Sequence, residues 1–469
     1  MSLQMPDSNL RRNRNFMIRS LLLLLSVGLP AGADALSPPL PLLDSVSIDS
    51  ITWKFARPTP VGRFVNGQVY ILGPTVISGI TPPPGNGRNG SVLNLPPDQG
   101  ISGFDDRVGG NRFRERLRVY PPIAMKPGDA LISSISVGTV GTDKRWLKED
   151  EAAISPVRSV SILTCLAAPV AADAFRPSYC GRSRKIYYAD SLRQNLLPNL
   201  KMWRSGTPDI ALFARHFKRP WLDVCFFGFD AAIGYQPDYG REVARATGMA
   251  SLLLCCDFTP AEKESLLVNF VQYGIDLWGI ASAGYPGWPA WGGHGSGRKW
   301  PIIFAGLMLN DSAMANPSGA YPRLFFGEDM QTMYDKGWTG AGVVYAGQRG
   351  VVNGKAVSTV PGWGPYENKP PDDWGDSNKI GEDDRRCCTS LSWVAEALCA
   401  HLLGAEKLWN HDAFFDYVDR WMTEDDSRSV AEIKQAKGWD YSASWGRQRQ
   451  CWDDFVQNMW EVYRFNRAR

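Results

Sequence analysis

Few residues in this sequence of 469 residues are of a kind and spacing that bind metal ions. It has four histidines, and none of them is arranged as H-x-x-x-H or H-E-x-x-H. Its nine cysteines form no C-x-x-C, which leaves zinc-ribbon and thioredoxin-type proteins without support. The Gly-Lys-Ser/Thr of a phosphate-binding loop and the G-x-S-x-G of serine hydrolases are missing too. We therefore expect no metal and no cofactor.

The sequence also lacks a strong charge of either sign. It has 51 basic and 48 acidic residues and a formal net charge of +3. The first 35 residues contain four arginines and two aspartates, which leaves 47 basic and 46 acidic residues in the rest. Nucleic-acid binding requires a clustered basic excess, so no nucleic-acid partner is expected. Affinity for a charged ligand must therefore come from a local site.

Long apolar runs are missing after residue 35, and the run before it is short. A basic stretch ends at Arg19, residues 21–29 are mostly apolar, and Ala-Asp-Ala at 33–35 has the form of a cleavage signal. This order is typical of a secretory signal peptide, and the apolar run is too short to span a bilayer. We expect residues 1–35 to be removed. The mature protein would then be periplasmic or secreted, with no stable membrane span.

The nine cysteines include two adjacent pairs, at 255–256 and at 387–388. Export permits disulfides, and Cys165 with Cys180 is the most plausible local bridge. The adjacent pairs lie in or near helical patterns, where buried free thiols are equally plausible. An odd number of cysteines leaves at least one of them unpaired in each molecule.

The N-terminal part of the chain has the pattern of a β-structure. Residues 36–45 are rich in proline and leucine and are typical of a linker. Two apolar runs then surround Asn66-Gly67, which is a strong hairpin signal. Residues 130–137 have the composition of a further strand, and several turn-forming pairs lie between the two. We predict a small β-sandwich over residues 46–165.

The C-terminal part has a helical pattern. Residues 166–205 are irregular, and the helical pattern begins at about residue 206. Thr259, Pro260 and Glu262 predict a helix start with a capping box and a proline in the first turn. Loops rich in glycine, proline and tryptophan separate the helices, and long loops are usually functional. The predicted helices cover residues 238–256, 259–280, 300–309, 390–403, 412–422 and 450–464.

Three segments resemble uncharacterised secreted bacterial proteins that are suspected relatives of α/α-toroid polysaccharide lyases and hydrolases. They are residues 62–67 (GRFVNG), 292–306 (GGHGSGRKWPIIFAG) and 414–422 (FFDYVDRWM). The resemblance implies an N-terminal β-sandwich followed by an α/α-toroid catalytic domain over residues 206–469. It brings a class of fold and activity, and it assigns no catalytic residue.

The densest candidate site is the glycine-rich segment just before the third predicted helix. Glycine lets the backbone approach a ligand closely, and the N-terminus of a helix favours an anion. His294 is a candidate base, and Arg298 and Lys299 are candidate partners for a carboxylate. Trp288 and Trp291 offer flat surfaces on which sugar rings stack. The alternative is structural, with His294 and Arg298 holding the loop.

Two further segments carry candidate residues. The first contains the adjacent carboxylates Glu328 and Asp329 and, a few residues later, Tyr334. The second segment, residues 363–388, is long, polar and aromatic. Its acidic cluster is more often a solvated loop, and its aromatic residues are candidates for sugar binding. The residues of interest in it are Trp363, Tyr366, Trp374, Glu382 and Asp383.

Two chemistries are compatible with these residues. A lyase for uronic-acid polysaccharides removes the proton next to a carboxylate and eliminates the 4-linked sugar, which requires a base and a neutralising cation. His294, Arg298, Lys299 and a tyrosine such as Tyr334 or Tyr366 supply this set without a metal. A glycoside hydrolase instead needs two carboxylates, one from the 328–329 pair and one from the 382–383 pair. The sequence slightly favours the lyase, and a non-catalytic glycan-binding protein is the third hypothesis.

Overall fold

The computed structural model describes most of the chain after residue 38. The expected signal peptide and several internal segments, which include Trp363, lie outside the described residues. Leu40–Arg469 forms one compact unit, and Met1–Pro39 is a separate one. The described residues are 39–97, 103–108, 113–138, 156–181, 183–202, 206–223, 236–237, 239–347, 350–352, 355–357, 364–442 and 446–465.

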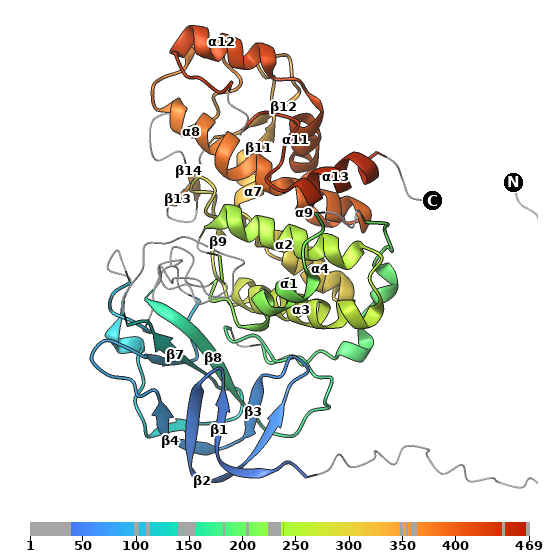
Figure 1. Ribbon diagram of the computed structural model, residues 1–469. Helices are drawn as coiled ribbons and strands as arrows, with labels where there is room; N and C mark the ends of the chain where they lie inside the picture. Colours follow the sequence, from blue (N-terminus) through green and yellow to red (C-terminus); the bar gives the residue numbers. More distant parts are fainter. Residues whose placement is uncertain are drawn as a thin grey trace, which may run out of the picture. The chain divides into compact units, whose positions relative to one another are not determined.

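The N-terminal strands form one eight-stranded sheet that curls into a half-barrel (Figure 1). The strand order is β5-β7-β8-β3-β2-β4-β6, and β1 also pairs with β2. The predicted hairpin at Asn66-Gly67 is confirmed, because β2 and β3 are antiparallel neighbours and Gly67 has a φ of 82°. The strands are β1 (Leu42–Ile48), β2 (Ile51–Arg63), β3 (Val69–Leu72), β4 (Thr75–Thr81), β5 (Ser91–Leu93), β6 (Ile123–Met125), β7 (Ala130–Ser136) and β8 (Val157–Leu166).

The inside of the curl holds its own hydrophobic core. Alternate residues of β2, such as Ile51 and Trp53, are buried there, as the period of a half-buried strand requires. The indole N–H of Trp53 donates a hydrogen bond of 2.9 Å to the hydroxyl of Ser133 in β7. Since β8 and β3 separate β7 from β2 in the sheet, this bond crosses the curl. The half-barrel is thus closed around its core by packing and by a buried polar contact.

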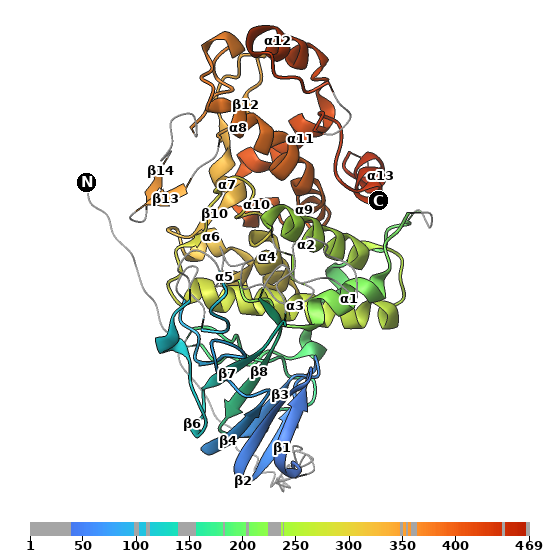
Figure 2. The same cartoon turned by 60° about the vertical axis from the view of Figure 1, so that its left-hand side comes forward.

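A helical region follows the sheet, and the six predicted helices are all present. Figure 2 shows α2, α4 and α9 side by side in the middle of this region. The helices are α1 (Ile210–Lys218), α2 (Gly240–Cys255), α3 (Pro260–Ser282), α4 (Lys299–Met308), α5 (Ser312–Ala315), α6 (Pro317–Ala320), α7 (Gly327–Gln331), α8 (Asn378–Asp384), α9 (Ser390–Leu402), α10 (Glu406–Trp409), α11 (Asp412–Thr423), α12 (Ser427–Lys437) and α13 (Asp454–Tyr463). Short strands lie in the loops: β9 (Gly287–Trp288), β10 (Phe325–Phe326), β11 (Thr332–Tyr334), β12 (Val343–Tyr345), β13 (Gly350–Val352) and β14 (Lys355–Val357).

The helices share one large core with the outer face of the sheet. Ile132 and Ile162, from β7 and β8, belong to the same buried cluster as the helical residues Phe270 and Trp300. A buried ion pair of 2.5 Å between Arg176 and Asp276 also joins the segment after β8 to α3. Mixed β and α content is therefore confirmed, and none of the described helices is both long and apolar enough to cross a membrane.

The expected disulfide between Cys165 and Cys180 is not formed. Both thiols are free and buried. Cys165 lies in the core inside the curl, whereas Cys180 belongs to the core shared with the helices. The sequence places the two cysteines close together, but the sheet separates them. The disulfide that does form joins the adjacent residues Cys387 and Cys388.

The capping box at the start of α3 is present as predicted. The hydroxyl of Thr259 accepts a hydrogen bond of 3.3 Å from the backbone of Glu262, whose carboxylate accepts one of 2.7 Å from the backbone of Thr259. We expect Thr259→Ala to lower the free energy of unfolding by about 1 kcal/mol, because the helix loses its cap. Ser265→Ala on the exposed side of the same helix is the matched control, with an expected change within about 0.5 kcal/mol. Equal thermal and urea midpoints for the two variants would contradict this.

Candidate functional site

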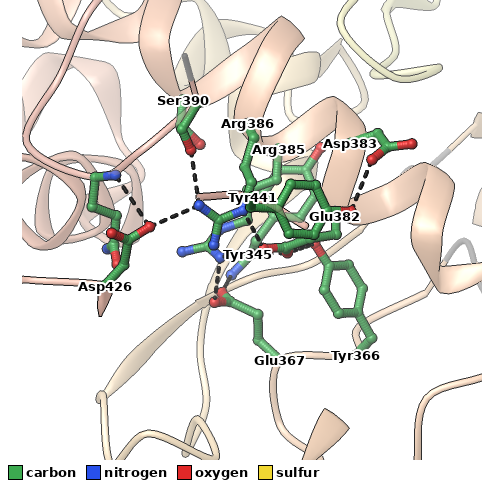
Figure 3. Close-up of polar contacts among 12 residues, drawn as sticks. Tyr345, Tyr366, Glu367, Glu382, Asp383, Arg385, Arg386, Ser390, Asp426 and Tyr441 are labelled. Atoms are coloured by element: carbon green, nitrogen blue, oxygen red, sulfur yellow. Dashed lines mark hydrogen bonds and ion pairs between the residues drawn. The ribbon is translucent and has the colours of Figure 1, made fainter. Parts of the chain in front are cut away.

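A buried ionic network surrounds the chain between α8 and α9 (Figure 3). Glu367 accepts two hydrogen bonds of 3.0 Å from the guanidinium group of Arg420 and lies 3.1 Å from that of Arg385. Both arginines and the glutamate are almost fully buried. Although burial favours the neutral acid, the two guanidinium groups lower the pKa of Glu367 to about 2. The carboxylate is therefore ionised at every physiological pH.

The second half of the network is centred on Arg386. Its side chain donates hydrogen bonds of 2.6 Å to Glu382 and 2.7 Å to Asp426. The hydroxyl of Tyr366 donates a further bond of 2.7 Å to the same Glu382. Figure 3 shows these side chains converging from separate parts of the chain. Tyr366 and Glu382, both expected at a ligand site, therefore bind each other inside the protein.

The segment between α8 and α9 is a single π-helical turn, Arg385–Thr389. Such turns are rare, and they often occur at functional sites. Arg385 and Arg386 direct their side chains into the ionic network, and the neighbouring residues Asp384 and Cys387 remain half-buried. The ionic network thus holds the π-helical turn in place. Asp384 and Cys387, which do not enter the network, lie next to a second group of polar side chains.

Two glycines allow the glycine-rich loop to approach this turn. A Cβ on Gly293 would lie 2.5 Å from the carbonyl oxygen of Cys388 and 2.8 Å from the hydroxyl of Tyr239. A Cβ on Gly240 would lie 2.2 Å from the carbonyl oxygen of His294. No side chain fits at either position, so the loop, the N-terminus of α2 and the π-helical turn meet only because these residues are glycine.

Tyr239, Arg241, His294, Asp384 and the Cys387–Cys388 disulfide form the group that we call the Asp384 site. The backbone N–H of Gly293 donates a bond of 3.0 Å to the hydroxyl of Tyr239, and the rings of Tyr239 and His294 are 4.6 Å apart, edge to face. Arg241 lies over the Tyr239 ring at 5.6 Å and donates to the carbonyl of Cys387 at 3.4 Å. All four named side chains are half-buried, which leaves them accessible from solvent.

Burial controls the electrostatics of this site. It raises the pKa of Asp384 to about 7, and the neighbouring charge of Asp383 adds to the shift. It also raises the pKa of Tyr239, and the charge of Asp384 contributes there as well. Both groups are therefore held toward their neutral forms by burial.

Arg298 and Lys299 are close to the loop as predicted, but both are committed to partners inside the protein. Arg298 binds Asp223 at 2.9 Å and also the carbonyls of His294 and Ser296. Lys299 is fully buried and binds Asp329 at 2.5 Å. Burial lowers the pKa of the Lys299 ammonium, and Asp329 opposes that effect. The two cations therefore hold the loop and the start of α4 in place.

A pair of buried carboxyl groups lies behind the loop. Glu328 accepts a bond of 2.6 Å from the backbone of Gly297, and Glu396 accepts one of 2.8 Å from Thr247. The second oxygen of each carboxyl has no hydrogen-bond partner among the described residues. Burial raises the pKa of Glu328 to about 7 and that of Glu396 well above its ordinary value, and Glu328 contributes to the shift of Glu396.

The remaining aromatic candidates are distributed over several places. Trp288 and Trp374 are buried, and each indole N–H donates to a backbone carbonyl. Trp291 is half-buried, and Trp363 lies outside the described residues. Tyr334 is 56% exposed and donates a bond of 2.6 Å to Asp416 of α11. Trp288 and Trp374 therefore contribute to the packing of the core, and Tyr334 makes a contact on the surface.

Sequence reasoning missed four residues, Tyr239, Arg241, Asp384 and Glu396. Asp384 belongs to the acidic cluster at 382–384, which is more often a solvated loop. Tyr239 gave no signal beyond its place before a helix, and Glu396 stands in the middle of an apolar helix. A charged residue on a helix that is otherwise apolar was the available clue, because a lone buried carboxyl needs a special environment.

Comparisons with known proteins give no match. No family model, no curated protein and no solved structure matches this chain. Within the described residues, the three ligand-type side chains that lie close enough to hold a metal ion are Asp384, Cys387 and Cys388. The functional argument therefore depends on the Asp384 site itself.

The ionic network gives a test of what holds the π-helical turn. We expect Glu367→Gln to lower the free energy of unfolding by about 3–5 kcal/mol, because two buried guanidinium groups lose their counter-charge. Glu424 is the matched control, since it binds the same Arg420 from a position that is 44% exposed. Glu424→Gln should cost less than about 1 kcal/mol. A similar small loss of urea stability in both variants would show that the network contributes little.

The buried carboxyl pair predicts a pH dependence of stability. The ordinary pKa of a glutamate side chain is 4.5. Because the pKa values of Glu328 and Glu396 are raised, the folded protein keeps protons at pH values where the unfolded chain has released them. The stabilisation is complete below about pH 4.5 and is lost as the pH rises through about 7.

Glu396→Gln removes one of the two ionisable groups. We expect the variant to gain stability relative to the wild type as the pH rises from about 5 to about 8, because the wild type must then ionise a buried carboxyl that the variant lacks. Thermal unfolding between these pH values measures the effect. Parallel pH profiles for the two proteins would show that Glu396 contributes nothing to the pH dependence of stability.

Proposed function

We propose that this protein is an exported carbohydrate-active enzyme that cleaves an acidic, uronic-acid-containing polysaccharide by β-elimination. The observation that carries the proposal is the Asp384 site. There a histidine, a tyrosine hydroxyl and an arginine meet at the border of the solvent. His294 and Tyr239 are in ring contact at 4.6 Å, and Arg241 lies over the same tyrosine at 5.6 Å.

Each group has a role in such an elimination. Arg241 forms an ion pair of 2.5 Å with Glu242, and its remaining N–H groups pair with the carboxylate of the uronic acid, which makes the neighbouring C–H more acidic. His294 takes that proton as the general base, and the electron pair forms the double bond while the bond to the 4-linked oxygen breaks. The hydroxyl of Tyr239 gives its proton to the departing oxygen and regains one from the histidine. Asp384 is half-buried, and its charge acts on Tyr239.

The proposal also includes the finer fold and the location. A β-rich part followed by a helical part is the order expected for a β-sandwich followed by an α/α toroid. The resemblance of the glycine-rich segment to secreted bacterial proteins agrees with this fold, and the apolar run before Ala35 agrees with export to the periplasm or the medium.

The hydrolase alternative finds less support in the contacts of its carboxylates. Glu382 is bound by Arg385, Arg386 and Tyr366, and Asp329 is bound by Lys299. Carboxylates held by buried cations are poor proton donors, because the cations stabilise the ionised form. A glycan-binding protein without activity is the other alternative. It would need neither the histidine nor the tyrosine hydroxyl.

The test is an assay of the full-length mature protein on a panel of uronic-acid polymers. We expect the ultraviolet absorbance of an unsaturated uronide to rise with the wild type, and His294→Ala or Tyr239→Phe to slow it by about 10²- to 10⁴-fold. Tyr188→Phe is the matched control. It changes an exposed tyrosine that is distant from Tyr239 in the sequence, and its expected rate is near that of the wild type.

Three outcomes would contradict this assignment. New reducing ends without unsaturation would favour the hydrolase. Binding of the polymers without products would favour the glycan-binding protein. Loss of activity in Tyr334→Phe but not in Tyr239→Phe would move the proton donor to Tyr334.

A further inference from the structure

Two adjacent cysteines and an aspartate meet at the edge of the Asp384 site. Cys387 and Cys388 are joined to each other by a disulfide. One ligand atom each of Asp384, Cys387 and Cys388 lies within 4.8 Å of the other two. These residues are three and four positions apart on a helical turn, which places them on one face.

We infer that reduction of the Cys387–Cys388 disulfide creates a binding site for one thiophilic divalent cation, Zn²⁺ or Cd²⁺, with the two thiolates and the Asp384 carboxylate as ligands. The inference is independent of the proposed function, because it concerns the binding of an ion and not the cleavage of a polysaccharide.

The required geometry is close to the one present. Zinc binds thiolate sulfur at about 2.3 Å and carboxylate oxygen at about 2.0–2.2 Å, so the ligand atoms of a tetrahedral site are less than about 4 Å apart. The three atoms are already within 4.8 Å of one another in the oxidised protein. Breaking one S–S bond lets both sulfurs turn toward the ion, and water completes the coordination.

The backbone around the site supports this change. Arg385 and Arg386 lie between Asp384 and the cysteines in the sequence, and their ion pairs with Glu367, Glu382 and Asp426 do not involve the disulfide. The turn therefore keeps its anchors after reduction.

Charge and solvent access also suit a cation. Two thiolates and a carboxylate carry three negative charges, which a divalent ion reduces to one. Arg241 donates to the carbonyl of Cys387 at 3.4 Å, and its own charge is paired with Glu242. Both Asp384 and Cys387 are half-buried, so an ion can enter from solvent.

The reaction is balanced with a small dithiol as the reductant. The dithiol gives two electrons and two protons to the Cys387–Cys388 bond and becomes a cyclic disulfide, while the protein gains two thiols. Binding of the divalent ion then releases the two thiol protons. Among the described residues, the free cysteines belong to no group of three ligand-type side chains as close together as this one.

The test compares the oxidised and reduced forms of the full-length mature protein. After treatment with dithiothreitol and its removal without oxygen, the protein is titrated with Cd²⁺ and followed by the ultraviolet absorbance of the sulfur–cadmium bond. We expect one equivalent to bind to the reduced protein at this site and none to the oxidised protein. The oxidised wild type is a control that contains no substitution.

Variants then assign the ligands. Cys387→Ser/Cys388→Ser should lose the site, and Asp384→Asn should weaken cadmium binding at least tenfold while the sulfur absorbance remains. Cys451→Ser removes a half-buried free cysteine elsewhere and should leave the stoichiometric difference unchanged. The inference is overturned if the oxidised protein binds Cd²⁺ as well as the reduced protein does. It is also overturned if the double serine variant, folded by circular dichroism, retains the site.

Discussion

The ion pairs of Glu367 with Arg385 and Arg420 are the constraint on which the helical region around the Asp384 site depends. Burying a charge costs free energy unless the charge is paired and hydrogen-bonded. The groups that bind this carboxylate are therefore held in place around it. The carboxylate also accepts a hydrogen bond of 2.6 Å from the backbone of Tyr345, which brings β12 into the same network. Parts of the chain more than 70 residues apart are thereby held together by charge rather than by apolar packing alone.

For function, it matters which side chains of this segment point into the protein and which lie near the solvent. Because Arg385 and Arg386 point into the ionic network, the half-buried Asp384 and Cys387 are left at the border of the solvent. The π-helical turn Arg385–Thr389, together with Asp384 before it, contains side chains that point both ways. The ion pairs stabilise the unusual backbone of this turn. The glycines of the neighbouring loop then allow His294 to approach. Stability and the candidate chemistry thus come from opposite sides of one short segment.

Local features of the sequence were predicted well, since neighbouring residues decide them. The capping box at Thr259 needs only four consecutive residues, and the hairpin at Asn66-Gly67 needs only a turn between two apolar runs. The helix positions followed from the spacing of apolar residues along the chain. The predicted disulfide failed because Cys165 and Cys180 are near in sequence, whereas the sheet places their side chains in different cores.

The sequence by itself determined the order of a β-rich part and a helical part and the positions of the main helices, and it indicated the loop around His294 as a candidate site. Only the tertiary structure decided which charges remain available to a ligand. Arg298 and Lys299 are neutralised by Asp223 and Asp329, whose positions 75 and 30 residues away follow no local pattern. Tyr239 and Asp384 join His294 for the same physical reason: long-range packing selects the neighbours of a buried charge, and no periodicity records that selection.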